Sequence, residues 1–106
     1  MITFDEFKKM ELVVGKILSV ESHPDADKLY VMQVDIGTET RQIVAGLKPY
    51  YEADQLAGKL AVIVANLAPA RLRGKDSNGM LLATQDGSNV IILSPERPVS
   101  PGSRVL

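Results

Sequence analysis

Apolar residues recur mostly at alternate positions, in short runs bounded by turn residues, which predicts strands rather than helices. Alternation is clearest over residues 29–36, and a nearly unbroken apolar run over residues 59–66 predicts a central strand buried on both faces. Gly15 lies inside the first strand, where we expect a bulge or a tight bend. The expected strands cover residues 12–20, 29–36, 41–44, 59–66, 80–84 and 90–93.

Two short helical segments interrupt this pattern. Thr3 and Glu6 have the spacing of a capping box, which predicts a helix over residues 4–9. A second helical turn is expected at residues 53–56, before Gly58.

The remaining segments are interpreted as loops. Residues 68–79 are expected to form a long basic and polar loop, and the proline-rich tail over residues 94–106 is expected to be extended. We therefore predict an all-β, single domain over residues 1–106. It is expected to be a five-stranded barrel of the oligonucleotide/oligosaccharide-binding (OB) fold, with a short N-terminal helix and extra C-terminal strands. An open sandwich is the alternative that periodicity leaves open.

Composition agrees with one globular domain. The chain has 106 residues, of which 45% are hydrophobic, so it can bury a substantial core. It contains no cysteine, which excludes disulfides and thiolate chemistry and fits a reducing compartment. No apolar run approaches the length of a membrane span, and the N-terminus does not resemble a signal peptide. We expect a cytoplasmic protein with no membrane partner.

Charge is distributed unevenly along the chain. The net charge is −1 and the pI about 5.8, which argues against a nucleic-acid binder that works by bulk charge. Residues 1–54 carry ten acidic and six basic side chains, whereas residues 55–106 carry three acidic and six basic ones. Basic density peaks at residues 71–75, so a local positive patch is expected on an otherwise acidic body.

The residues point to a binding module rather than an enzyme. His23 is the single histidine and precedes a proline in a polar loop. With Asp25 and Asp27 it lacks a fourth metal ligand, so a solvated turn is the better interpretation. No glycine-rich phosphate-binding loop or dinucleotide fingerprint occurs. We predict no catalytic residue, no metal and no cofactor.

Several segments together resemble the tRNA-binding domain family. This family includes a stand-alone dimeric tRNA-binding protein and the C-terminal domain of many bacterial methionyl-tRNA synthetases. The most specific stretch is Asn-Leu-x-Pro at residues 66–69, followed by Arg-Gly at 73–74 and Ser-x-Gly-Met at 77–80. The matching segments are residues 7–17, 23–30, 41–47, 64–74 and 77–83.

The resemblance implies an OB barrel that binds tRNA by the shape of its elbow and acceptor region, not by the anticodon. It also implies a homodimer, for which residues 90–93, Val99, Val105, Phe4 and Phe7 are the candidate interface. The chain begins directly at the domain, so we expect either a stand-alone protein or a domain excised from a synthetase, which it would assist. The residues that the resemblance assigns to tRNA binding are Lys28, Arg41, Asn66, Arg71, Arg73, Ser77, Asn78 and Met80.

The sequence departs from the family pattern in the basic segment. Residue 68 is Ala where many members carry Lys, and Asp76 lies among the basic residues. Both changes predict a moderate, salt-sensitive affinity. The alternative function is a secretion-related protein chaperone or a protein-interaction module of the same fold. That chaperone branch lacks the Arg-Gly-x-x-Ser-x-Gly-Met stretch of residues 73–80, which counts against it.

Overall fold

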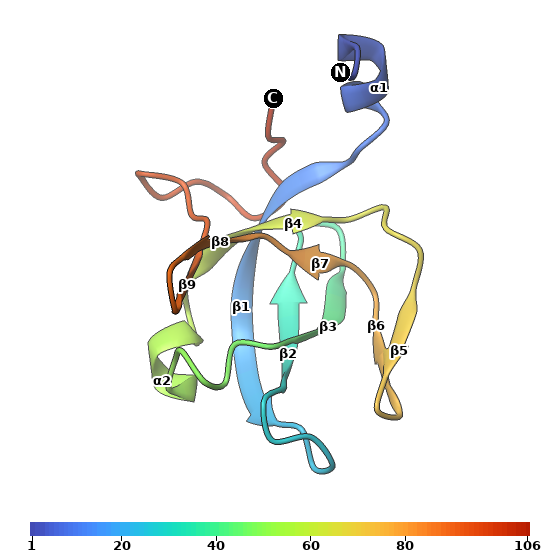
Figure 1. Cartoon of the computed structure of the whole chain (residues 1–106). Helices are drawn as coiled ribbons and strands as arrows, with labels where there is room; N and C mark the ends of the chain where they lie inside the picture. Colours follow the sequence, from blue (N-terminus) through green and yellow to red (C-terminus); the bar gives the residue numbers. More distant parts are fainter.

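The computed structural model describes all residues, 1–106, and consists mainly of strands that wrap into a barrel (Figure 1). The helices are α1 (Phe4–Lys8) and α2 (Ala53–Leu56). The strands are β1 (Leu12–Ser22), β2 (Tyr30–Asp35), β3 (Thr40–Ala45), β4 (Leu60–Val64), β5 (Ala70–Leu72), β6 (Lys75–Ser77), β7 (Met80–Leu81), β8 (Ala83–Asp86) and β9 (Asn89–Ile92). Neither helix has the length or apolar character that a membrane crossing requires.

The barrel is a five-stranded antiparallel sheet in the order β3-β2-β1-β4-β7. β1 is long and pairs with two strands: its first half pairs with β4 and its second half pairs with β2. The sheet closes where the backbone N–H of Asn78 donates to the carbonyl oxygen of Gln42 on β3, at 2.8 Å. The predicted OB barrel is therefore confirmed, and the open sandwich is not what the chain forms.

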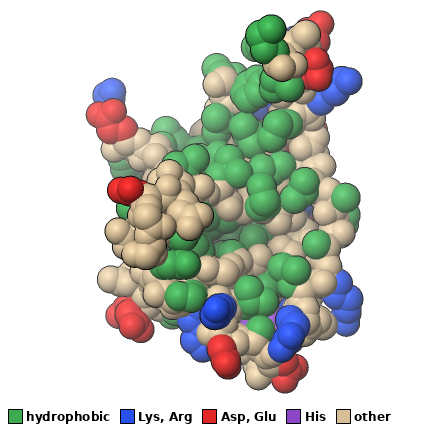
Figure 2. Space-filling view, viewed as in Figure 1, with side chains coloured by type: hydrophobic (Ala, Val, Ile, Leu, Met, Phe, Trp, Pro, Cys, Tyr) green, Lys and Arg blue, Asp and Glu red, His purple; other side chains and the backbone are tan.

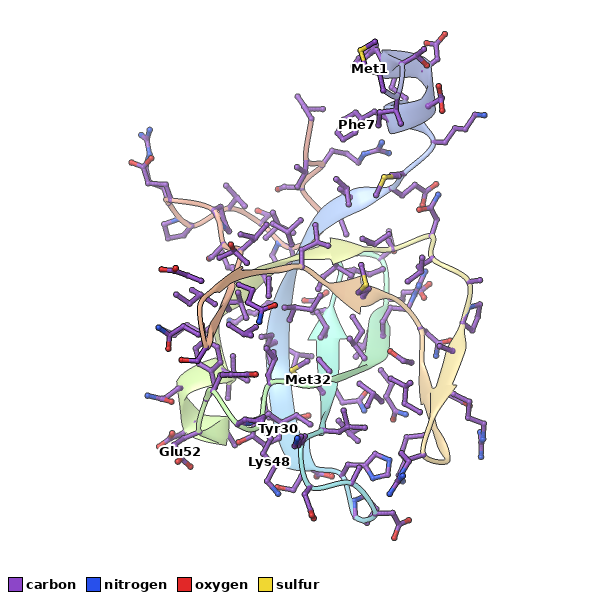
Figure 3. The ribbon with its side chains drawn as sticks, viewed as in Figure 1. Met1, Phe7, Tyr30, Met32, Lys48 and Glu52 are labelled. Atoms are coloured by element: carbon purple, nitrogen blue, oxygen red, sulfur yellow. The ribbon has the colours of Figure 1, made fainter.

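The core fills the inside of this barrel. Alternate residues of β2, namely Tyr30, Met32 and Val34, point inward, as the alternating pattern predicts. Met32 lies in the middle of the barrel and is fully buried (Figure 3). Leu56 of α2 is also fully buried, so this single turn of helix covers one opening of the barrel. Burying each side chain of this size contributes about 1.5–3 kcal/mol.

The two helices and the central strand test the sequence predictions directly. α1 begins with the predicted capping box, in which Thr3 and Glu6 bond each other's backbone N–H groups. β4 is less buried than predicted: Ala61 and Ile63 face the core, whereas Val62 on the other face is only half-buried. The prediction of a strand buried on both faces was wrong, because no second layer covers the outer face.

The bulge in β1 follows Gly15 by three residues. The register between β1 and β2 shifts between Ile17 and Ser19, so the extra residue is Leu18. Gly15 serves a close approach instead. A Cβ built there would lie 2.6 Å from Cγ1 of Val34 and 2.9 Å from Cγ1 of Ile63. The expected bulge at Gly15 was misplaced, since the glycine makes room for the side chains of two other strands.

Two predicted segments have more structure than expected. Residues 68–79 contain the β5–β6 hairpin rather than a plain loop. The single strand expected at residues 80–84 is divided into β7 and β8, which belong to different sheets. The tail over residues 94–106 is extended as predicted, and it returns to β1 through a bridge between Val13 and Arg104.

Candidate nucleic-acid interface

Two connections project from the same end of the barrel, opposite to both chain termini (Figure 1). One is the loop between β1 and β2, residues 23–29, which we call the 23–29 loop. The other is the β5–β6 hairpin, residues 70–77, which we call the 70–77 hairpin. In an OB fold these are the connections that flank the ligand-binding face of strands 2 and 3.

The tip of the 70–77 hairpin is a two-residue turn. Leu72 pairs with Lys75, and the residues between them, Arg73 and Gly74, both have positive φ, 53° and 87°. Two successive positive φ values are those of a type I′ turn, which matches the twist of a tight hairpin. Glycine adopts this conformation freely, whereas arginine does so at some cost. The turn places Arg73 at the tip of the hairpin.

The 23–29 loop and the hairpin tip are hydrogen-bonded to each other. The ring nitrogen Nε2 of His23 lies 3.1 Å from the carbonyl oxygen of Leu72. The guanidinium of Arg73 donates to the carbonyl oxygen of Asp25, at 3.1 Å. The two connections therefore form one continuous edge rather than two independent loops.

Two hollows lie against this edge. A polar one of about 330 Å³ sits on the outer face of the sheet, with Gln33 of β2, Gln42 of β3, Lys75 of the hairpin and the acidic Glu21 of β1 in its wall. Lys28 and Arg73 together line a second hollow of about 300 Å³. A larger hollow of about 560 Å³ lies elsewhere, between residues 49–51 and 88–91, but no charged side chain lines it.

Charges of both signs are interleaved at this end (Figure 2). The 70–77 hairpin carries three basic residues and Asp76, a net of +2, whereas the 23–29 loop carries two acids and Lys28, a net of −1. Arg71 donates to Asp76 at 2.7 Å, and both side chains are more than half exposed. The predicted positive patch is therefore local to the hairpin and partly neutralised by its own aspartate.

Arg41 was predicted to contact tRNA, and the structure gives it partners inside the protein. Its side chain pairs with Glu39 and donates to the carbonyl oxygens of Ala65, at 2.9 Å, and Asn78, at 3.2 Å. These bonds join β3 to the segments that follow β4 and β6. Arg41 thus fastens the closing seam of the barrel.

Asn66 and Ser77 are also used internally. The Asn66 amide accepts from the N–H of Glu11 at 2.9 Å and donates to the carbonyl of Lys9 at 2.7 Å, which ties the segment after β4 to the segment after α1. The buried Ser77 hydroxyl accepts from the N–H of Val44 at 3.0 Å and donates to Gly79. Both side chains position the polypeptide next to the hairpin.

The other predicted residues fall into two groups. Lys28, Arg71 and Arg73 are exposed and stand along the shared edge. Met80 is 44% exposed and lines an apolar groove of about 330 Å³ on the other side of the hairpin, and Asn78 lies half-buried at the seam. The structure thus brings three of the predicted cations to one edge and separates Met80 from them.

Three residues of this region were not predicted. His23 is 4% exposed, where a solvated turn was expected. Gln42 donates to the carbonyl oxygen of Asp76 at 2.8 Å and accepts from Gln33 at 3.2 Å, so it links the strand face to the hairpin. Lys75 completes the wall of the polar hollow. Lys75 had a signal in the sequence as part of the basic cluster. His23 and Gln42 lie in segments that resemble the family, but neither was assigned a role at this edge from the sequence.

Comparison with known proteins identifies the family of this chain. Residues 12–104 match the model of the tRNA_bind family, the tRNA binding domain. A methionine–tRNA ligase of Thermococcus kodakarensis is 54% identical over 104 residues, which is 98% of this chain and 14% of the ligase. The chain thus spans about one seventh of the length of the curated relatives it matches.

Solved structures show the same fold along the whole chain. A methionyl-tRNA synthetase-related protein from Pyrococcus horikoshii superposes with a TM-score of 0.93 at 32% identity, covering 100% of this chain and 98% of that one. The chaperone CsaA of Picrophilus torridus gives a TM-score of 0.92 at 27% identity, with both chains covered completely. The family match and the higher identity to the ligases favour tRNA binding over the chaperone alternative. The chain belongs to the tRNA-binding domain family that includes domains of methionine–tRNA ligases.

Proposed function

We propose that this domain binds tRNA in its elbow and acceptor region through the edge formed by the 23–29 loop and the 70–77 hairpin. The observation that supports this most is the joining of these two connections. It places Lys28 and Arg73 at one hollow and Lys75 at a second, polar one, which Glu21 also lines. A face with few aromatic groups and dispersed cations suits recognition of a folded RNA by shape. Bases of the anticodon are not required for it.

The cations and one amide at this edge have defined chemical tasks in the proposal. Arg71, Arg73, Lys28 and Lys75 donate to phosphate oxygens, which gives affinity and orientation. The amide of Gln33 faces the polar hollow and suits a ribose hydroxyl or a base edge.

The buried and seam residues act one step away from the RNA. Internal hydrogen bonds hold the strand ends and the base of the hairpin in place, and they come from Arg41, Asn66 and Ser77. The base of the hairpin is flanked by Asn78 and Met80. In this arrangement a tRNA contact by Met80 requires the RNA to reach over the hairpin, because Met80 lines the apolar groove on its other side.

The domain itself is proposed to be non-catalytic and to work in the cytoplasm, since its relatives are aminoacyl-tRNA synthetases. It raises the tRNA affinity of a synthetase as an appended domain or acts as a stand-alone binder. We further propose a homodimer in which α1 and the tail meet a second copy, because Phe4, Phe7 and Val105 line one apolar hollow. Light scattering that shows a monomer at micromolar concentration would exclude the dimer.

The test is binding of labelled bulk tRNA across a salt series. Arg71→Ala/Arg73→Ala removes two phosphate contacts, so the slope of log K against log salt falls in magnitude by about 1.4–1.8. Lys59→Ala/Arg97→Ala is the matched control, because it removes the same charge from exposed positions away from the edge. Wild-type protein that does not bind at low salt, or equal losses in both double variants, would refute the proposal.

A further inference from the structure

We propose that His23 is a positioning residue for tRNA binding, which holds the tip of the 70–77 hairpin against the 23–29 loop. This inference rests on the proposed function, because it explains how the cations of that same edge are fixed. His23 carries none of the binding charge itself. Its role follows from the hydrogen bonds of its two ring nitrogens and from the way the hairpin is attached.

The two bonds of His23 define one tautomer of the ring. Nδ1 accepts from the backbone N–H of Asp25, at 2.9 Å, and therefore carries no proton. Nε2 must then carry the proton of the neutral ring, and it donates to the carbonyl oxygen of Leu72, at 3.1 Å. The ring is 4% exposed, so water has little access to replace either bond.

The two strands of the hairpin are attached to the rest of the protein differently. β6 is fastened to β3 by Ser77, which accepts from Val44, and by Gln42, which donates to Asp76. β5 and the turn make only two hydrogen bonds outside the hairpin, and both lead to the 23–29 loop. The outer strand and the tip therefore depend on this junction for their position.

Asp25 connects the two bonds of the junction. Its backbone N–H is held by the ring of His23, and its carbonyl oxygen accepts from the guanidinium of Arg73. The ring thus orients both the residue before the turn, Leu72, and the acceptor that directs Arg73. Arg73 uses one of its five N–H groups here, which leaves others for a phosphate. Fixing the tip in advance lowers the entropy cost of binding.

Two conservative variants separate the two bonds. In His23→Asn the amide oxygen takes the place of Nδ1 and keeps the bond from Asp25, but no donor reaches Leu72. In His23→Gln the amide nitrogen takes the place of Nε2 and keeps the bond to Leu72. The proposal predicts that the bond to the hairpin matters most, so the glutamine variant, which loses only the bond from Asp25, stays closer to wild type than the asparagine variant does.

The first measurement needs no RNA. Backbone ¹⁵N order parameters of residues 71–75 are expected to fall in His23→Asn from about 0.85 to about 0.6 or below, while β2 and β3 are unchanged. They are expected to remain high in His23→Gln. An asparagine variant with a fully ordered hairpin would overturn the inference, whether or not the protein binds tRNA.

The second measurement is tRNA affinity across salt. His23→Asn is expected to bind about threefold to tenfold more weakly, the range for one lost hydrogen bond, while the salt slope stays the same because no cation is lost. Arg73→Ala, in contrast, lowers the slope. If the wild-type protein does not bind tRNA, the proposed function fails. The order parameters alone then show whether His23 holds the hairpin in place. A disordered hairpin with wild-type affinity would show that positioning is irrelevant to binding.

Discussion

Asp76 is the residue whose removal is expected to improve tRNA binding. It stands on β6 inside the basic hairpin and forms an ion pair with Arg71 at 2.7 Å, with both side chains more than half exposed. A phosphate that approaches Arg71 must compete with this carboxylate. Asp76→Asn keeps the size of the side chain, removes its charge and raises the net charge of the hairpin from +2 to +3.

The size of the effect follows from the exposure of the pair. An exposed ion pair of this kind contributes about 0.2–1 kcal/mol, which corresponds to about 1.5-fold to 5-fold tighter binding once the competition ends. The slope of log K against log salt is expected to steepen by less than about 0.7–0.9, the value of one full phosphate contact, because Arg71 already meets phosphate in the wild type. The free energy of unfolding is expected to change by less than about 1 kcal/mol, since the pair is solvated.

The assay is fluorescence anisotropy with labelled bulk tRNA over a salt series. Asp86→Asn is the control, because it makes the same charge change at an exposed position on β8, outside the proposed edge. Tighter binding is expected only for Asp76→Asn, and most of the gain is expected to vanish when Arg71 is also replaced by alanine. Equal gains at both positions, or no change at Asp76, would show that the ion pair does not limit binding.

Three further predictions concern the barrel, and chemical denaturation measures each. Gly15→Ala is expected to cost about 1–3 kcal/mol, because its Cβ would meet Cγ1 of Val34 at 2.6 Å; an unchanged midpoint would contradict that close approach. Met32→Ala is expected to cost about 2–5 kcal/mol, since the side chain is fully buried, and a smaller loss would mean that the core collapses around it. Ser77→Ala leaves the N–H of Val44 unpaired and is expected to cost about 1–3 kcal/mol, whereas Ser77→Thr, which keeps the hydroxyl, serves as its comparison.

The features that the sequence predicted correctly depend on near neighbours along the chain. The capping box of α1 joins Thr3 and Glu6, three residues apart, and the alternation of β2 is visible within one strand. Gly15 could not be interpreted in the same way. A glycine in a strand permits either a bulge or a close approach, and the choice depends on Val34 and Ile63, which the sequence does not place.

The hairpin was missed for a related reason. β5 and β6 have three residues each, and all but Ser77 are exposed, so they show no apolar alternation. Their turn needs a positive φ at Arg73, a conformation that arginine seldom adopts.

The sequence predicted a local cluster of basic side chains, but not which candidate residues have partners inside the protein. Arg71 and Arg73 are exposed, because a cluster of charges usually remains in water. The partners of Arg41 lie 24 and 37 residues away, and that of His23 lies 49 residues away. Only the folded topology shows that these side chains meet backbone carbonyls, so sequence alone could not separate a residue that touches tRNA from one that supports the site.

The return of the tail to β1 has a consequence for how the domain is joined to other proteins. Val14 bonds Ser103 and Gly102, and Val105 bonds Leu12, so both ends of the chain leave the barrel side by side (Figure 1). They depart from the pole opposite the 23–29 loop. A carrier fused at either end, or a short linker that joins the two ends into a permuted chain, would leave the proposed edge uncovered. The domain can therefore be joined to another protein at either end without blocking the proposed edge.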